Sequence, residues 1–429
     1  MRQLAYTLLI LLLSLCCSCQ DNDAESLAYI ESGVPSYCVK NVREQVERLQ
    51  QLSQTGVADM LYITDTHYAD NTLDSPGILS FFAHKGLTRR VVWGGDAISA
   101  YGEIQTEWDH HQRDFLGSVA PYTSYYMVRG NHEYTAIDKT QNRSSTYPQL
   151  QTASLLRAHL ETDVVRPADD PEACYYYFDD LEQHLRYCVF DTTDSIDSST
   201  KYWNTLPHTS QRQLDWMDHH ALHNVPMGFS LVIVTHIGIT PETYAPHAPF
   251  EPLLQLVQHA GAPVLMVLSG HRHQDFQTYR QGILHVLTGP DALYPDLHNS
   301  PFLHDIVRKS KTSTAPLMDL FSFSDDRKTI HALRVGAGYS RTFHLDALSL
   351  SLTSRQPLPQ LTSFDSDQKV SWTAYDATGY DCIDDVWEPP CTILRITPDG
   401  FLQPLQRGEA VLMATSHDGR REFFNVKVR

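Results

Sequence analysis

The stretch MLYITDTHY at residues 60–68 joins two kinds of signal within nine residues. Its first four side chains are apolar or aromatic, which predicts a short buried strand. The run then stops at Asp65 and His67, and both of these side chains are good metal ligands. The same arrangement, an apolar run that ends in polar side chains, recurs along the chain.

Four further strand-like runs end in a carboxylate, an amide or an imidazole. These runs are RRVVWGGD (89–96), SYYMVRGNHE (124–133), SLVIVTHI (230–237) and APVLMVLSGHRH (262–273). The polar residues near their ends are Asp96, Asn131, His132, His236, His271 and His273. Open α/β sheets place their ligand sites outside the carboxyl ends of the strands. We therefore expect all five strand ends to meet in one crevice.

The residue types in this crevice favour a transition-metal centre. Hard carboxylate and amide oxygens mixed with neutral imidazole suit Zn²⁺, Mn²⁺ or Fe rather than Ca²⁺ alone. Glycines stand immediately before the polar residues, at Gly94–Gly95, Gly130 and Gly270. At such positions the backbone must turn sharply and approach an ion without a Cβ in the way.

The ordered blocks D-x-H, G-D, G-N-H-D/E, H and G-H-x-H are similar to those of the calcineurin-like metallophosphoesterases. All five blocks occur in order between Asp65 and His273. The resemblance implies an α/β fold over residues 28–350, a layered β-sandwich flanked by helices in the order α/β/β/α. It also implies two divalent ions, of unspecified identity, that activate water to hydrolyse a phosphate mono- or diester.

The resemblance further implies a role for each polar residue. Seven of them would be metal ligands: Asp65, His67 and His273 at one ion, Asn131, His236 and His271 at the other, and Asp96 as a bridge. His132 would be catalytic without ligating, by donating to the phosphate or protonating the leaving oxygen. Glu133 is expected to support the loop, and Arg129 to pack in its strand, with contact to phosphate as the alternative.

Two further histidine-rich strings are expected to have a structural role and not a catalytic one. DHH occurs at 109–111 and at 218–220, a string used by a different phosphoesterase family. Both copies fall on predicted helices and lack the other blocks of that family, so we expect solvated helix faces. The chain also contains no GxSxG elbow, P-loop or HExxH motif.

Helical spacing and strand-like runs alternate through the first 350 residues, which indicates an α/β layered domain. Helices are predicted over 36–53, 75–86, 103–119, 148–162 and 210–224. The composition becomes polar and proline-containing over 351–368, which is typical of a linker. The remaining segment, 369–429, reads as short strands and predicts a small all-β sandwich that resembles the bacterial Ig-like type 2 module.

The first 19 residues predict an export signal. A charged Arg2 precedes an apolar stretch at 4–15 that is too short to span a bilayer comfortably. The cysteine-rich end resembles a bacterial lipoprotein box with Cys19 as the acylated residue. Cys17, or cleavage without lipidation, is the alternative. The expected location is the periplasm or the cell surface, with attachment to the membrane through a lipid anchor.

Charge and cysteine content add further expectations. The formal net charge of −18 disfavours nucleic acid as a partner and leaves a small phosphorylated substrate. In an exported chain, disulfides are predicted for Cys174–Cys188 and Cys382–Cys391, with buried free thiols as the alternative. The first pair falls opposite if its hairpin centres on Leu181. Oligomeric state is not predicted.

Several alternative functions remain open at this point. A surface-binding protein that keeps the fold without turnover is one, and sphingomyelinase-like or nucleotidase-like phosphoesterases are others. Purple acid phosphatases are disfavoured, because their blocks carry Gly in place of His67 and Tyr in place of Ser99. Nothing in the sequence selects the substrate.

Overall fold

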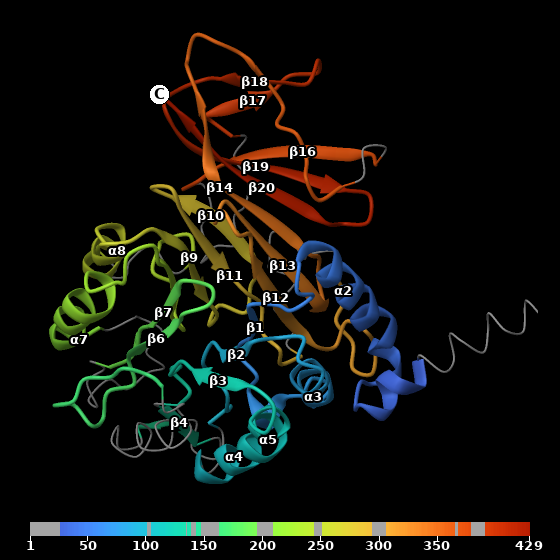
Figure 1. Cartoon of the computed structure of the whole chain (residues 1–429), viewed down its shortest axis with the longest axis vertical. Coiled ribbons are helices and arrows are strands. Elements are labelled where there is room, and N and C mark those ends of the chain that lie inside the picture. Colours follow the sequence, from blue (N-terminus) through green and yellow to red (C-terminus); the bar gives the residue numbers. More distant parts are fainter. Residues whose placement is uncertain are drawn as a thin grey trace, which may run out of the picture.

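Two β-sheets packed face to face form the centre of the protein, and helices cover their outer faces (Figure 1). This computed structural model describes residues 26–100, 104–133, 135–138, 143–146, 163–194, 209–243, 251–293, 306–364, 368–378 and 391–429. The layer order α/β/β/α agrees with the predicted fold class. The predicted leader over 1–19 lies outside the described residues.

The first sheet has nine strands in the order β16-β19-β20-β14-β13-β12-β1-β2-β3. Their bounds are β1 Met60–Ile63, β2 Arg90–Trp93, β3 Ser124–Met127, β12 Leu317–Phe323, β13 Thr329–Gly336, β14 Arg341–Leu350, β16 Val370–Asp376, β19 Gly408–Ser416 and β20 Arg421–Val428. Strands β1, β2 and β3 are parallel, with Leu61 beside Val91 in the register. Their carboxyl ends therefore lie along one edge of the sheet.

The second sheet has six strands in the order β10-β11-β9-β8-β7-β6. Their bounds are β6 Tyr176–Asp180, β7 Leu185–Val189, β8 Ser230–Val234, β9 Val264–Ser269, β10 Phe276–Arg280 and β11 Ile283–Leu287. Strands β7, β8, β9 and β11 run parallel to one another. A separate hairpin pairs β4 Thr135–Asp138 with β5 Arg143–Thr146.

The helices match the predicted amphipathic segments closely. Their bounds are α2 Val39–Leu52, α3 Pro76–His84, α4 Ile104–His111, α5 Gly117–Val119, α7 Gln211–Trp216 and α8 Glu251–Gln258. Predictions over 36–53, 75–86, 103–119 and 210–224 are confirmed, α8 was not predicted, and 148–162 lies outside the described residues. None of the helices in the described part of the chain has the length and apolar character needed to cross a membrane.

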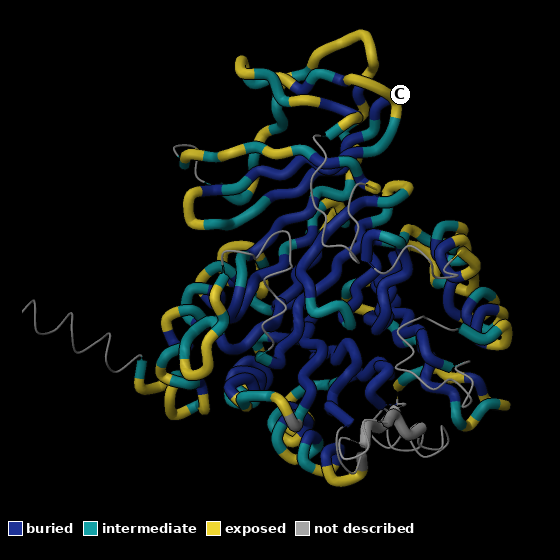
Figure 2. The backbone as a smooth tube through the Cα atoms, turned by 180° about the vertical axis from the view of Figure 1, so that it is seen from behind, coloured by how far each residue is buried: buried dark blue, intermediate teal, exposed yellow. Residues whose placement is uncertain are grey.

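Three apolar cores separate the four layers, and Figure 2 shows the strands of both sheets as the most deeply buried part of the chain. In β1, Leu61 and Ile63 face the helices, whereas Met60 and Tyr62 face the second sheet. Because such a strand is buried on both faces, its sequence is a continuous apolar run rather than an alternating one.

The C-terminal strands extend the first sheet. Strand β20 pairs in parallel with β14, and β19 and β16 continue the sheet beyond it. A three-stranded sheet of β15 Gln356–Pro357, β18 Phe401–Pro404 and β17 Leu394–Ile396 packs against them over a core of its own. One strand of this second layer, β15, thus comes from the predicted linker over 351–368. The Ig-like character of 369–429 stays a prediction.

The predicted disulfide between Cys174 and Cys188 is wrong, since both residues keep their thiols: Cys174 Sγ donates to the carbonyl oxygen of Glu172 and Cys188 Sγ to that of Ala221. The hairpin pairs Tyr177 with Cys188 and Asp180 with Leu185, so its centre lies beyond Leu181 and the two cysteines are not opposite. They also belong to different apolar cores. The predicted pairing of Cys391 is likewise wrong: its thiol is free and donates to Asp376 Oδ1 at 3.1 Å, while Cys382 lies outside the described residues.

Candidate metal centre

The carboxyl ends of five strands meet at one place between the two sheets. The first sheet supplies the residues that follow β1, β2 and β3, and the second sheet supplies those that follow β8 and β9. The structure brings all eight predicted residues to this place: Asp65, His67, Asp96, Asn131, His132, His236, His271 and His273.

The first group of donor atoms comes from Asp65, His67 and His273, which offer atoms within 4.8 Å of one another. Asp65 Oδ1 lies 3.5 Å from His273 Nε2 and 3.8 Å from His67 Nε2. The two imidazole Nε2 atoms are 3.1 Å apart. Asp65 and His67 are fully buried, and His273 is partly exposed.

The second group comes from Asn131, His236 and His271, together with Asp96. His236 Nε2 lies 3.1 Å from Asn131 Oδ1 and 3.1 Å from Asp96 Oδ2. His271 offers a ring nitrogen within 4.8 Å of the Asp96 and His236 atoms. Asp96 Oδ2 also lies 3.9 Å from His67 Nε2, in the first group. The Asp96 carboxylate thus lies between the two groups.

The geometry of both groups fits divalent metal ions. Ligand atoms that surround one Zn²⁺ tetrahedrally at about 2.0–2.2 Å are about 3.3–3.6 Å apart. The separations of 3.1 to 3.9 Å between Asp65, His67, His273, Asp96 and His236 fall close to this range. Imidazole, carboxylate and amide oxygen are the donors that first-row divalent metals accept.

Attraction between the carboxylates and the imidazoles shifts the pKa values of the ligand residues. Burial alone would raise the pKa of Asp65, but hydrogen bonds from His273 and His67 hold that pKa well below its usual value. Burial would likewise raise the pKa of Asp96, and His132 and His236 lower it instead. Burial would lower the pKa of His236, yet Asp96 raises it to about 10. An ion that binds through the His236 ring would have to displace the proton shared with Asp96.

Backbone strain is concentrated at the same positions. Five of the eight residues have positive φ values: Asp65 49°, His67 42°, Asp96 50°, His271 74° and His273 55°. A residue with a Cβ in this left-handed region costs about 1–3 kcal/mol and persists only where its surroundings hold it. This strain is a signal of function that the sequence motifs alone did not carry.

Glu133 is one of the groups that hold the strained loops. Its buried carboxylate accepts backbone hydrogen bonds from Asp96 N at 3.0 Å, Ala97 N at 2.7 Å and Ile98 N at 3.3 Å, and from Gly130 N at 2.7 Å. The predicted supporting role of Glu133 is confirmed. Burial and the nearby Asp96 raise its pKa to about 7.

His132 lies beside the two groups. Its Nδ1 is 2.9 Å from the carbonyl oxygen of Ser99, an arrangement in which Nδ1–H donates. Its Nε2 then lies 3.7 Å from Asp96 Oδ2. Burial lowers the pKa of His132 to about 3, so the ring is neutral near pH 7. Glu107, which was not predicted, holds the Ser99 loop by accepting from Ser99 N and Ala100 N at 3.1 and 2.8 Å.

Two further expectations concern Arg129 and the DHH strings. Arg129 is buried and pairs with Asp191 Oδ2 at 2.5 Å, so its packing role is confirmed. The solvated face predicted for 218–220 is confirmed for its exposed histidines. The same prediction is wrong for His111, which is fully buried and stacks on Trp108 and Phe115. The helix widens into a π-helical turn at 112–116 there, which changes the face it presents.

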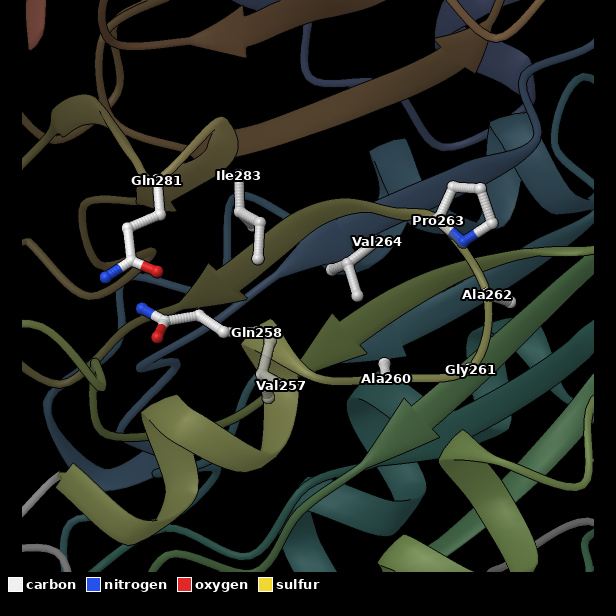
Figure 3. Close-up of a pocket in the computed structure, with 9 residues that line it drawn as sticks. All are labelled: Val257, Gln258, Ala260, Gly261, Ala262, Pro263, Val264, Gln281 and Ile283. Atoms are coloured by element: carbon white, nitrogen blue, oxygen red, sulfur yellow. The ribbon is translucent and has the colours of Figure 1, made fainter.

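A separate hollow of about 410 Å³ lies at the start of β9, at the opposite end of that strand from His271 and His273 (Figure 3). Its lining residues are Val257, Gln258, Ala260, Gly261, Ala262, Pro263, Val264, Gln281 and Ile283. None of these side chains is titratable. The groups suited to catalysis therefore lie in the strand-end cluster and not in this hollow.

The sequence model of the calcineurin-like phosphoesterase family matches residues 60–275. No curated protein matches the sequence significantly. Among solved structures, a dimetal phosphatase from Danio rerio is 16% identical, covers 67% of this chain and 98% of its own, and has a TM-score of 0.46. A purple acid phosphatase from yellow lupin seeds is 14% identical, covers 66% of this chain and 53% of its own, and has a TM-score of 0.42.

The matched segment begins at Met60, in the strand that leads to Asp65, and ends two residues after His273. It therefore contains all eight residues of the strand-end cluster and spans half of the chain. On this match, the chain belongs to the calcineurin-like phosphoesterase family.

Proposed function

We propose that this protein hydrolyses a phosphate mono- or diester at a centre of two divalent metal ions. The single observation that carries the proposal is the position of the Asp96 carboxylate, 3.1 Å from His236 Nε2 of one donor group and 3.9 Å from His67 Nε2 of the other. A carboxylate placed between two sets of metal donors is what a dinuclear site requires.

The residues that would hold the ions divide as the family resemblance implies. Asp65, His67 and His273 would hold one ion, and the other would be held by Asn131, His236 and His271, with Asp96 shared. When bound, such a pair polarises phosphate oxygens and lowers the pKa of water towards neutrality. Two divalent ions and two carboxylates leave about +2 at the site, which attracts phosphate despite the acidic surface.

His132 supplies proton chemistry beside the ions. The hydrogen bond between its Nδ1 and the Ser99 carbonyl fixes the ring and leaves Nε2 directed towards the Asp96 side of the site. In the neutral ring Nε2 carries a lone pair, so it would first take up a proton, as from the attacking water, and could then pass that proton to a phosphate oxygen or to the leaving oxygen. Neither role selects between a monoester and a diester, so the proposal covers both.

Removal of metal tests this function directly. Protein stripped with a chelator is expected to lose essentially all hydrolysis of p-nitrophenyl phosphate and of its bis ester, because imidazoles and carboxylates alone cannot clamp the phosphate. Adding Zn²⁺, Mn²⁺ or Fe²⁺ should restore the rate, and elemental analysis should give about two ions per chain.

Two outcomes would contradict the proposal. One is an unchanged rate in protein that retains less than one ion per chain after chelation. The other is metal-replete protein without turnover of any phosphomonoester, diester, nucleotide or phospholipid in a panel. The second result would favour a surface-binding protein that keeps the fold without catalysis.

We also propose that the chain is exported and anchored through an acylated Cys19. The proposal rests on the charged and apolar leader over 1–19 and its cysteine-rich end. In a bacterial host, labelled palmitate is expected to enter the full-length chain and to be lost in Cys19→Ala but not in Cys17→Ala. Loss of label in Cys17→Ala alone would assign the acylated residue to Cys17, and absence of label from the wild-type chain would contradict the lipid anchor.

A further inference from the structure

A buried carboxylate also follows strand β11 of the second sheet. Strand β11 is followed by Thr288, Gly289, Pro290 and Asp291, and the Asp291 side chain is almost fully buried. This residue lies beyond the segment 60–275 that matches the family. It is also absent from the three groups of metal-donor atoms. Its contacts therefore need an explanation other than direct metal binding.

The backbone at Asp291 holds the strained turn that carries Asp65 and His67. Asp291 N donates to the carbonyl oxygen of Thr64 at 2.9 Å, and Ala292 N donates to that of Asp65 at 3.0 Å. These two hydrogen bonds attach the turn, at Thr64 and Asp65, to the segment that follows β11. On its other side, Asp65 N and His67 N donate to carbonyls of the Gly95–Asp96 loop, each at 3.0 Å.

The Asp291 side chain also supports the turn at a third residue, Thr66, through Asn71. Its Oδ2 accepts from Asn71 Nδ2 at 2.8 Å, and the same Asn71 amide nitrogen donates to the carbonyl oxygen of Thr66 at 2.8 Å. Its Oδ1 accepts from Ser75 Oγ and from Leu317 N. The carbonyls of Thr64, Asp65 and Thr66 are therefore all fixed by Asp291 or its immediate partners.

Arg308 keeps this segment in place. Its guanidinium donates to three successive carbonyls, those of Pro290 at 2.8 Å, Asp291 at 2.8 Å and Ala292 at 2.7 Å. The arginine also brings a positive charge close to the buried Asp291 carboxylate, which offsets part of its desolvation cost. The segment 290–292 is thus a rigid support and not a free loop.

We propose that Asp291 is a positioning residue for one half of the metal centre, the half formed by Asp65, His67 and His273. This inference rests on the proposed function, because it concerns how that centre is built. Asp65 and His67 hold left-handed φ values of 49° and 42°. Asp291 and Asn71 offset the cost of that strain, so removing them lets the turn relax and moves the two ligands apart.

The other half of the centre has a support of its own, in addition to the hydrogen bonds from His271 N to the Asp65 carboxylate at 3.2 and 3.0 Å. Glu133 accepts from Gly130 N and Asp96 N, next to Asn131 and the shared carboxylate. Replacement of Asp291 should therefore weaken one metal position and leave the other nearly unchanged. A general loss of stability would affect both positions, so selectivity is the property that separates positioning from a merely structural role.

Metal titration of the full chain tests the proposal, with Mn²⁺ as the probe and calorimetry and electron paramagnetic resonance as readouts. Wild type is expected to bind two ions and to give the signal of a coupled pair. Asp291→Asn should keep one binding event at wild-type affinity and weaken the other by about 10–100-fold, the usual cost of losing a group that orients a ligand. Its signal should become that of a single ion.

Two variants accompany this measurement. Asn71→Ala, at a half-buried position, removes the same link without touching a buried carboxylate and should reproduce the selective loss. Glu422→Gln is the matched control, because Glu422 is a fully buried carboxylate that accepts backbone hydrogen bonds from Thr362 and Ser363. It lies on β20, and both metal affinities should stay at wild-type values.

The outcomes separate the two proposals. If wild type binds two ions and both Asp291→Asn and Asn71→Ala do so with unchanged affinities, the positioning role is overturned while the proposed function stands. Equal weakening of both ions in Asp291→Asn also overturns it, because the effect is then general. If wild type binds no ion, the proposed function fails and the inference fails with it.

Discussion

Replacement of Asp96 by Asn is expected to lower the rate of phosphate-ester hydrolysis by about 10³-fold or more, equivalent to about 4 kcal/mol of transition-state stabilisation. Asp96 is the one carboxylate placed between the two donor groups of the described site. An amide of the same shape removes the negative charge and one acceptor oxygen, so both metal positions weaken together. Initial rates on p-nitrophenyl phosphate and its bis ester measure the effect.

The Asp96→Asn chain should remain folded, because the substitution preserves side-chain volume and the backbone bonds to Glu133. Asp59→Asn is a suitable control. Asp59 is also buried and lies just before β1, at the opposite end of that strand from Asp65, where it accepts from Phe323 N at 2.8 Å. Undiminished activity in Asp96→Asn would end the proposed mechanism.

Deletion of residues 368–429 is expected to give a chain that does not fold to a soluble monomer. The deleted strands β19 and β20 continue the nine-stranded sheet, and β20 covers an edge of β14. Phe423, Val411 and Met413 also belong to the apolar core between the two sheets. Burial of each such side chain is worth about 1.5–3 kcal/mol, and a whole domain has only about 5–15 kcal/mol of net stability.

Soluble yield and thermal unfolding measure this second effect, and a pair of point variants isolates its cause. Phe423→Ala removes a fully buried ring and should cost about 3–5 kcal/mol. Phe401→Ala changes a ring that is 36% exposed in the small sheet, and should cost much less. A truncated chain with the wild-type unfolding temperature and metal content would show instead that the C-terminal segment is an independent appendage.

The strand ends could be predicted because their signal is local. An apolar run buried on both faces, followed at once by a ligand, is readable over ten residues, as at 60–68 and 262–273. Fold rules then place the ends of parallel strands together. Amphipathic helices such as α2 and α3 follow from the same local reasoning, since their spacing alone identifies the face that packs on the sheet.

What the sequence did not reveal depends on pairing between distant segments. The parallel contact of β14 with β20 joins residues about 80 positions apart, across a segment whose composition is typical of a linker. The hairpin register that separates Cys174 from Cys188 depends on a turn centred between Glu182 and Gln183 instead of on Leu181. The support given by Asp291 arises from hydrogen bonds to a turn more than 200 residues earlier, and no periodicity encodes it.

Each donor group draws on both layers of the sandwich. Asp65 and His67 follow a strand of the nine-stranded sheet and His273 a strand of the six-stranded sheet, and Asn131 and His236 are divided in the same way. Metal ions bound at this site would therefore cross-link the two sheets. Occupancy at a hundred times the dissociation constant adds about 2.7 kcal/mol to the folded state. A shortage of metal would therefore make the chain more susceptible to proteolysis and would also abolish its proposed activity.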